Sequence, residues 1–382
     1  MSTQKQLSTR WAEVPKINSM NLVHWDRHRQ KDRSRLQRSL LRDYLSHDIY
    51  PYSHYYRQLL DSAGIEPDTF REVADFGQLA PTTLGIVQSQ PWSFVLRPDE
   101  DTIAQFGDRR LLRQAVWARV RGRGGAFNRD VIDPSYKPVQ WVIAGGLPIG
   151  SSQQDVDRLA TAGERALAVA GLTRDDVLLN LTSPDPTLAY LQLSCGALHS
   201  GISSLTLSTE MNLDLISAAA PSVVAGPART VYEVLTRLVN AGLRLPELRR
   251  VVVLGTVLGA DARATLANLA YAVSHNQVDV LAMWSPKGSR ALWAECDAEH
   301  GFHTYPDLEW VYSISGGAKA SALMWTSLAW HGTALMWLET GLFAHIDERD
   351  CPHCGRSVPR VFPSATPVRT NALASQGALP RG

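Results

Sequence analysis

The feature that most constrains the fold is a regular alternation of apolar runs and amphipathic helical segments between residues 139 and 280. The strand-like runs lie at 139–146, 175–184, 201–207 and 248–256, and helix-like segments lie at 155–172, around Tyr190, at 228–242 and at 261–273. Parallel strands need helical crossovers of this kind to connect them. The alternation therefore predicts an α/β fold, with a parallel sheet flanked by helices.

The pattern changes after Asp279, where strand-like text continues without helices between the runs. The runs are "VDVLAMWS", "RALWAEC", "LEWVYSI" and "ASALMWTSL". This change predicts a smaller β-rich subdomain after the parallel sheet. We expect four parts, namely a helical N-terminal extension (1–75), an α/β core (76–280), a β-rich subdomain (281–362) and a loose tail rich in Pro, Ala and Ser (363–382).

The charge balance narrows the choice of partners. The 382 residues include 38 basic and 37 acidic ones, for a formal charge of +1, so no overall field directs the chain to nucleic acid or membrane. The first residues lack the apolar core of a secretion signal, and no apolar run reaches the roughly 18 residues of a transmembrane helix. We expect a cytoplasmic protein without a membrane segment.

Two basic stretches need separate interpretation. Residues 21–60 are basic and aromatic but carry acids throughout, which favours a solvated helix packed on the core. In residues 108–125, one helical face collects apolar side chains and the arginines lie elsewhere, which predicts a surface helix; the apolar residues are Leu111, Leu112, Ala115, Val116 and Val120. Nucleic-acid binding through the arginines at 27–42 and 109–123 is the weaker alternative, and it predicts an affinity that falls steeply with salt.

The strongest chemical signal is a group of cysteines and histidines in the last third of the chain. Cys351 and Cys354 form a C-x-x-C turn, and Cys296 and His303 precede it by about fifty residues. Three thiolates and one imidazole make a closed tetrahedral zinc site, which is structural because no position remains for substrate. His300 and His353 compete for the imidazole position.

Two other interpretations of these cysteines remain open. The C-x-x-C pair can be a plain reduced turn, with Cys296 as a small buried hydrophobe. A redox role is weaker, because no helix clearly starts at Cys351 to lower a thiol pKa.

The order of segments over most of residues 50–362 resembles the adenylate-forming enzymes of the phenylacetate-CoA ligase type. The resemblance rests on "YPYSHYYRQLLDSAGIEPDTF", on "LWAECDAEHGFHTYPDLEWVYSI", on "LMWTSLAWHGTALMWLETGL" and on "CPHCGR". It implies an N-terminal domain of the adenylate-forming superfamily. Such enzymes use ATP and Mg²⁺ to form an acyl-adenylate and then pass the acyl group to a thiol, usually coenzyme A. In relatives, the matching Cys and His residues can hold zinc.

The resemblance fails at the nucleotide motifs. The family's phosphate loop, S-S-G-T-T-G-K-P, is matched by 141–148, where only the turn residues Gly145 and Gly146 remain. Gly255 begins the match to the Gly-Gly-Glu-Pro turn, which here lacks the glutamate, and Lys287 stands beside the position of the magnesium-holding glutamate. Thr340 and Gly341 remain from Thr-Gly-Asp without the aspartate, and Trp337 replaces an arginine just upstream. The resemblance also provides no match for the family's lysine-bearing C-terminal domain.

These departures lead to three functional hypotheses. We expect a pseudoenzyme that binds neither ATP nor Mg²⁺ and serves as a binding, scaffold or accessory subunit. Its former acyl and nucleotide cleft would take a protein partner or an aromatic or acyl ligand, and tryptophans of the β-rich part, where they are not core, would line it. The alternative is an enzyme with altered acyl-transfer or carboxylate-activating chemistry, and the third is an active ligase with unusual motifs.

Few residues could carry such altered chemistry. Cys195 and His199 lie four residues apart on one helix face, as a nucleophile and its base would, and Lys287 is a further candidate. The competing interpretation of the first two is a helix packed in the core.

Overall fold

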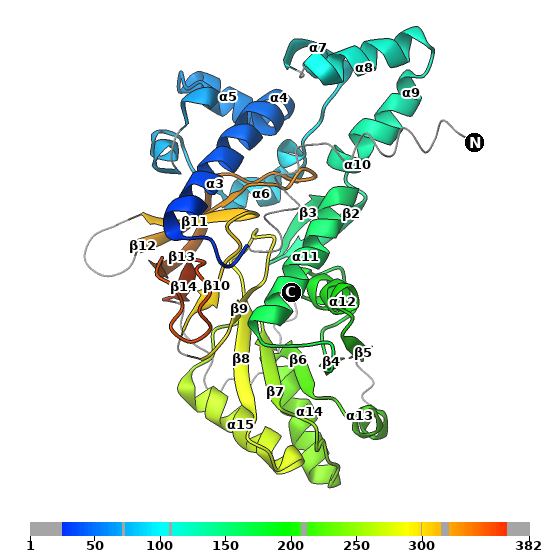
Figure 1. Ribbon diagram of the computed structural model, residues 1–382, viewed down its shortest axis with the longest axis vertical. Helices are drawn as coiled ribbons and strands as arrows, with labels where there is room; N and C mark the ends of the chain where they lie inside the picture. Colours follow the sequence, from blue (N-terminus) through cyan, green and yellow to red (C-terminus); the bar gives the residue numbers. More distant parts are fainter. Residues whose placement is uncertain are drawn as a thin grey trace.

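The computed structural model describes residues 25–70, 73–106, 109–207, 212–298, 300–314 and 321–364 (Figure 1). One large sheet runs through the molecule, in the order β11-β12-β13-β14-β10-β9-β8-β7-β6-β4-β5, with β1 paired to β13. Its strands are β1 (Thr82–Thr83), β4 (Val177–Asn180), β5 (Ser203–Thr206), β6 (Val223–Pro227), β7 (Arg250–Leu254), β8 (Asp279–Trp284), β9 (Trp293–Glu295), β10 (Phe302–His303), β11 (Glu309–Ile314), β12 (Ser321–Ser327), β13 (Leu338–Asp347) and β14 (Arg360–Pro363).

The predicted parallel sheet is confirmed. Strands β5, β4, β6, β7 and β8 pair in parallel, with Val224 opposite Val251 and Val252 opposite Leu281. The near-continuous apolar sequence of β6 and β7 is typical of strands covered on both faces, and these side chains are almost fully buried.

The β-rich part continues this sheet. Strand β8 pairs in parallel with β7 on one side and antiparallel with β9 on the other. The domain boundary expected between residues 280 and 281 therefore falls inside β8. Sequence patterning suggested a separate unit because helices disappear there, but the backbone hydrogen bonds pass without a break into antiparallel pairs.

Two helix pairs pack on the sheet, α11 (Gln153–Val169) with α12 (Leu188–Ser200), and α14 (Ala228–Ala241) with α15 (Ala260–Ser274). Helix α13 (Leu213–Ala219) follows β5. Helices α11 and α12 touch along Gly163 and Gly196, where an added Cβ on Gly163 would lie 2.0 Å from the Gln192 carbonyl oxygen. The close approach of two backbones explains glycine at both positions.

A separate two-stranded hairpin precedes α11. It consists of β2 (Gln140–Ala144) and β3 (Leu147–Ser151), paired antiparallel. The sequence predicted β2, the glycine pair and the helix but missed β3. The reason is that β3 contains Pro148 and Gly150, which are rare in strand interiors.

The N-terminal helices hold the antiparallel end of the sheet. They are α3 (Gln30–Tyr44), the π-helical η2 (Leu45–Ile49), α4 (Tyr50–Tyr52) and α5 (His54–Ser62), followed by the short turns η3 (Pro67–Thr69) and η4 (Val73–Gln78), α6 (Leu84–Ser89) and η5 (Pro91–Phe94). Buried Arg33 of α3 bonds to the Ser357 carbonyl and to Glu348. Gln37 donates to the Glu309 carbonyl at 3.2 Å.

A helical arm extends from the top of the molecule in Figure 1. It contains α7 (Glu100–Phe106), α8 (Arg109–Val120), α9 (Gly124–Phe127), η6 (Asn128–Ile132) and α10 (Asp133–Tyr136). The surface helix predicted in 108–125 is thus present, but its expected apolar face is split. Leu112 and Ala115 are partly buried, whereas Val116 and Val120 are exposed.

The tryptophans of the antiparallel half are core residues rather than the lining of an open surface. Trp284, Trp293, Trp325, Trp330 and Trp337 are all buried, and Trp310 is partly buried. Among the described helices, none is long and apolar enough to span a lipid bilayer.

Candidate functional site

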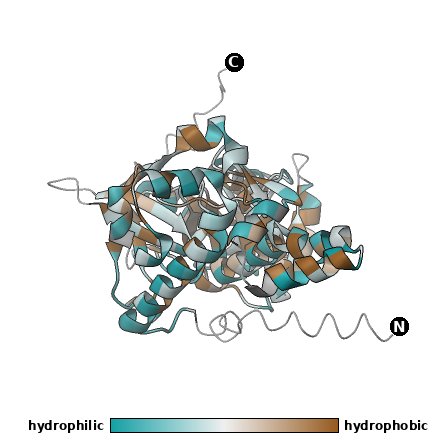
Figure 2. Cartoon of the chain, turned by 90° about the horizontal axis from the view of Figure 1, so that it is seen from above, coloured by the Kyte–Doolittle hydropathy of each residue, from teal (hydrophilic) through white to brown (hydrophobic). Residues whose placement is uncertain are grey.

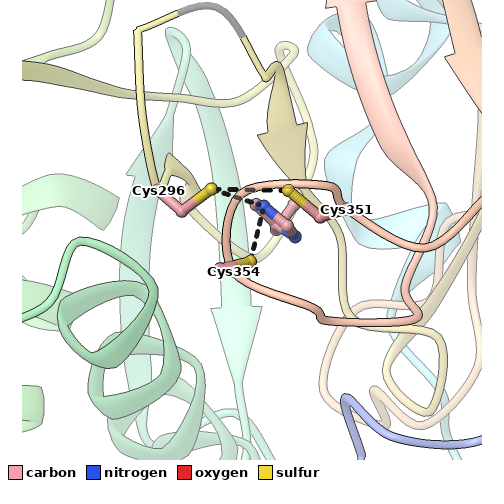
Figure 3. A group of neighbouring side chains, drawn as sticks. Cys296, Cys351 and Cys354 are labelled. Carbon is pink, nitrogen blue, oxygen red and sulfur yellow. Dashed lines mark hydrogen bonds between the residues drawn. The ribbon is translucent and has the colours of Figure 1, made fainter.

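Four side chains from two segments converge beside the antiparallel strands (Figure 3). Cys296 directly follows β9, and His303 ends β10, so a short connection brings both to one place. Cys351 and Cys354 come from the turn between β13 and β14, where Gly355 donates to the Cys351 carbonyl at 2.9 Å. The four residues predicted from spacing are therefore brought together.

The distances fit a tetrahedral ion. The sulfurs of Cys296 and Cys351 are 3.6 Å apart, and His303 Nε2 lies 3.3 Å from the Cys296 sulfur and 3.6 Å from that of Cys354. All ligand atoms lie within 4.8 Å of one another. A tetrahedral zinc site with Zn–S bonds of about 2.3 Å has ligand–ligand edges of about 3.8 Å. The arrangement could hold such a metal.

The electrostatics of the cluster lower the pKa of the Cys351 and Cys354 thiols and raise the pKa of the Cys296 thiol, which shares its proton with Cys354. The hydrogen bond from the Cys296 thiol, reinforced by one from His303, lowers the pKa of the Cys354 thiol. A thiol held as thiolate is the form that binds metal.

His300 and His353 lie outside this group of four. His300 pairs with Asp297, with 3.0 Å between Nδ1 and Oδ1, and its ring stacks on that of His353 at 5.4 Å. His303, with its side chain buried against the sulfurs, is the imidazole of the cluster.

A buried ion pair fixes the strand that leads to Cys296. Arg263 of α15 bonds to both oxygens of Glu295, at 2.6 and 2.9 Å, and Glu295 also accepts from the Ala282 amide at 2.7 Å. This link ties β9 to α15 and β8, so the cluster is attached to the parallel half of the sheet as well.

The Gly145–Gly146 pair is the two-residue turn of the β2–β3 hairpin. Both residues have positive φ, +61° and +88°, the combination that tight hairpin turns demand. Lys287 packs on this turn, because a Cβ on Gly145 would lie 2.6 Å from Lys287 Cγ and 2.9 Å from its Cα. A hydrogen bond of 3.4 Å from the Gly288 amide to the Ala144 carbonyl joins the same two segments.

The space behind this turn is filled. The gap between the hairpin and the two helices that follow it is too small to hold a water molecule. Its lining residues are Val142, Ala144, Ile149, Ser151, Leu159, Leu188, Ser289 and Arg290.

The other three positions singled out by the resemblance have structural partners. Gly255 follows β7 with φ +77° and donates its amide to the Met283 carbonyl at 2.8 Å. The Thr340 hydroxyl donates to the Leu323 carbonyl at 2.6 Å, and Gly341 follows it with φ +71°. Gly255 and Thr340 thus bond to the neighbouring strands β8 and β12, and Gly341 has the left-handed backbone conformation that favours glycine.

Trp337 lies in an aromatic stack. Its ring lies 5.5 Å from that of Phe76 on one side and 5.0 Å from that of Tyr312 on the other, both nearly parallel to it. The side chain that takes the place of the family's arginine is therefore buried between two rings.

Cys195 and His199 share α12 but not a contact that would activate a thiol. His199 is exposed, and its Nδ1 lies 2.8 Å from Glu164. Burial raises the pKa of the Cys195 thiol, which disfavours the thiolate. This environment resembles the core-helix interpretation more than a nucleophile and its base.

One buried polar network has no counterpart among the predicted residues. Asp155 accepts from the His331 amide at 3.0 Å and lies 3.7 Å from Arg290, while the His331 ring lies 3.4 Å from Asp48. Burial alone would raise the pKa of Asp155, but Arg290 lowers it. Tyr136 donates to Asp48 at 2.6 Å. Because the members come from separate segments, no spacing rule could have grouped them.

Comparisons with known proteins give matches among solved structures. No protein-family model matches the sequence, and no curated protein matches it significantly. Among solved structures, an open conformation of 2-hydroxyisobutyryl-CoA ligase in complex with 2-HIB-AMP and CoA is similar, with a TM-score of 0.69 at 12% identity. The match covers 88% of this chain and 70% of that one.

A second structure of that ligase is also similar to this chain. The postadenylation state with R3-HIB-AMP has a TM-score of 0.68 at 13% identity, over 89% of this chain and 69% of the other. Sequence identity this low supports a shared fold and does not show a shared activity. The chain has the fold of this acyl-CoA ligase.

Proposed function

We propose that this protein is a binding or accessory subunit built on the adenylate-forming fold, which does not activate carboxylates with ATP. The observation that carries the proposal is the turn at Gly145 and Gly146. A phosphate-binding loop surrounds the anion with backbone amides and hydroxyls. A two-residue hairpin turn flanked by Ala144 and Leu147 has neither the length nor the hydroxyls.

Two further contacts support the proposal. Lys287 belongs to the segment matched to the magnesium-binding motif, and it packs directly on the glycine turn. The Trp337 ring occupies the space between Phe76 and Tyr312. Both side chains stand at positions matched to nucleotide-binding motifs, and neither offers a ligand for Mg²⁺.

The alternative of altered acyl-transfer chemistry has less support. It depends on Cys195, His199 or Lys287, and the first two lack the hydrogen bond that would couple a thiol to its base. Lys287 remains as the candidate of that alternative, with its stem against the hairpin turn.

For the metal cluster we propose structural zinc. Three thiolates and one imidazole complete a tetrahedron, so the ion would staple the turn at 351–354 to β9 and β10 rather than bind a substrate. Zinc would contribute no chemistry beyond holding these segments together.

The test of the proposed function is calorimetric titration of the full chain with Mg-ATP, together with a pyrophosphate-exchange assay over a panel of carboxylic acids. The 2-hydroxyisobutyryl-CoA ligase serves as the positive control. We expect no heat of ATP binding and no exchange. Binding near micromolar, worth about 8 kcal/mol, or exchange with any acid would overturn the proposal and restore carboxylate activation.

A further inference from the structure

Within the part of the chain that the structure describes, an apolar stripe on the outward face of α8 is left exposed. Val116, Trp117 and Val120 are 54%, 59% and 77% exposed, although each is a residue type that normally seeks burial. They lie within about 1.1 turns of the helix, on its exposed side. The inward residues Leu112 and Ala115 already supply the packing of α8 against its surroundings, so the outward stripe is not needed to hold the arm in place.

Exposed arginines lie at the border of the stripe. Residues 109–123 contain six arginines and neither aspartate nor glutamate. The Arg121 guanidinium lies 4.7 Å from the centre of the Trp117 ring, a cation–π contact that holds the charge next to the apolar surface. Arg123 is exposed just beyond the helix. At the right of Figure 2, where Figure 1 places α8 and α9, brown residues lie directly beside teal ones.

We propose that this face of α8 binds an acidic amphipathic helix of a partner protein. Apolar side chains spaced three to four residues apart are the anchors through which one helix pairs with another. Arg121 and Arg123 favour glutamates or aspartates beside the partner's apolar stripe, because opposite charges at the border of an interface select the partner and speed its encounter.

Other anionic partners fit the stripe less well. A helix that lies in a membrane surface needs an apolar face along most of its length. Here Leu112 and Ala115 pack inward, and the exposed apolar residues described on α8 span less than two turns. Nucleic acid would use the arginines but would leave Val116 and Val120 without a contact. The surface belongs to the arm and involves no residue of the former nucleotide cleft, so the inference is independent of the proposed function.

The experiment measures binding of the full chain to a labelled helical peptide of about 18 residues, with leucines at three- and four-residue spacing bordered by glutamates. A second peptide carries lysines in place of the glutamates. Vesicles of phosphatidylglycerol and a DNA duplex are tested in parallel. We expect binding to the glutamate peptide alone.

The variants locate the contact. Trp117→Ala and Arg121→Glu should each weaken binding about tenfold, the effect of removing an interface anchor. Tyr271→Ala is the matched control, because Tyr271 is a similarly exposed aromatic residue on α15 and should leave binding unchanged. The substituted side chains are exposed, so unchanged melting temperatures should verify that the fold is intact.

Several results would overturn the inference. They are equal binding of both peptides, binding of neither, preferential binding of vesicles or DNA, and a glutamate-peptide affinity that Trp117→Ala does not change.

Discussion

Gly145 shows how tightly the neighbouring segment packs against the β2–β3 hairpin turn. Gly145 and Gly146 both have positive φ, so both pay a conformational cost when replaced by alanine. Only Gly145 also faces a neighbour, because its added Cβ would meet Lys287, while that of Gly146 would meet nothing within 4 Å. Comparing substitutions at the two positions therefore separates the energetic cost of backbone strain from that of steric contact.

We therefore predict that Gly145→Ala destabilises the chain more than Gly146→Ala. The strain common to both should cost about 1 kcal/mol, and overpacking against Lys287 should add about 1–3 kcal/mol to Gly145→Ala. The free energy of unfolding in urea measures both. Equal losses for the two variants would mean that Lys287 moves away freely and does not close the space beside the turn.

Among the elements, the antiparallel strands are tied together by one buried carboxylate. Glu309, at the start of β11, accepts hydrogen bonds from the indoles of Trp293 in β9 and Trp325 in β12, and from the Tyr305 amide at 3.2 Å. Burial raises the pKa of Glu309 to about 7. The folded chain therefore keeps a proton on this group at pH values where the unfolded chain has lost it.

This pKa shift gives a pH-dependent prediction. Between the unfolded pKa near 4.5 and the folded pKa near 7, the folded state binds more protons, so its stability falls as pH rises. Glu309→Gln removes the titration. From pH 5 to pH 8, we expect the free energy of unfolding of the wild type to fall by about 2–3 kcal/mol relative to that of the variant.

Urea unfolding of both proteins at the two pH values provides the measurement. Taking the difference removes the pH dependence that they share, including that of the cysteine cluster. Parallel pH profiles would show that Glu309 has the same pKa in both states.

Sequence patterning predicted some elements well and others poorly. The helices at 153–169 and 228–241 and the apolar strands between them have strong periodicity, and the structure confirms them. Strands β10 and β14 have two and four residues, and nothing local distinguishes them from turns. They exist because neighbouring strands provide hydrogen-bond partners, which is information that lies elsewhere in the chain.

The candidate site shows the same division. The cysteine cluster was predictable because metal ligands obey spacing rules, and His303 could be chosen over His300 only once β10 was placed. The tight turn at Gly145 was not predictable from a motif, because its length became apparent only when Leu147–Ser151 proved to be a strand. The Asp155 network depends on tertiary packing alone.

At the scale of the whole molecule, the cysteine cluster links segments that are far apart in sequence. The turn at 351–354 connects to β9 and β10 through the cluster, and Arg33 reaches Ser357 and Glu348 just beside it. Loss of the metal should therefore loosen both the antiparallel strands and the N-terminal helix α3.

We predict that Cys354→Ser abolishes stoichiometric zinc binding and lowers the melting temperature by about 5–10 °C, since metal affinity at such a site contributes directly to folding. Cys195→Ser is the matched control and should change neither quantity. Metal analysis and calorimetry give the two measurements, and a chelator should lower the melting temperature of the wild type but not of Cys354→Ser. A variant that still held one zinc per chain would contradict the ligand assignment.

The position of β14 has a consequence for how the protein is made. Strand β14 lies between β13 and β10, so its hydrogen bonds join the antiparallel end of the sheet to the parallel half. It is also the last of these strands to be synthesised. While the ribosome is still producing residues up to Pro363, the emerging chain has its parallel half, but β10 and β13 each lack a neighbour. Unpaired strand edges of this kind attract other chains. The interval before β14 emerges is therefore the time at which a nascent chain of this protein most needs a chaperone.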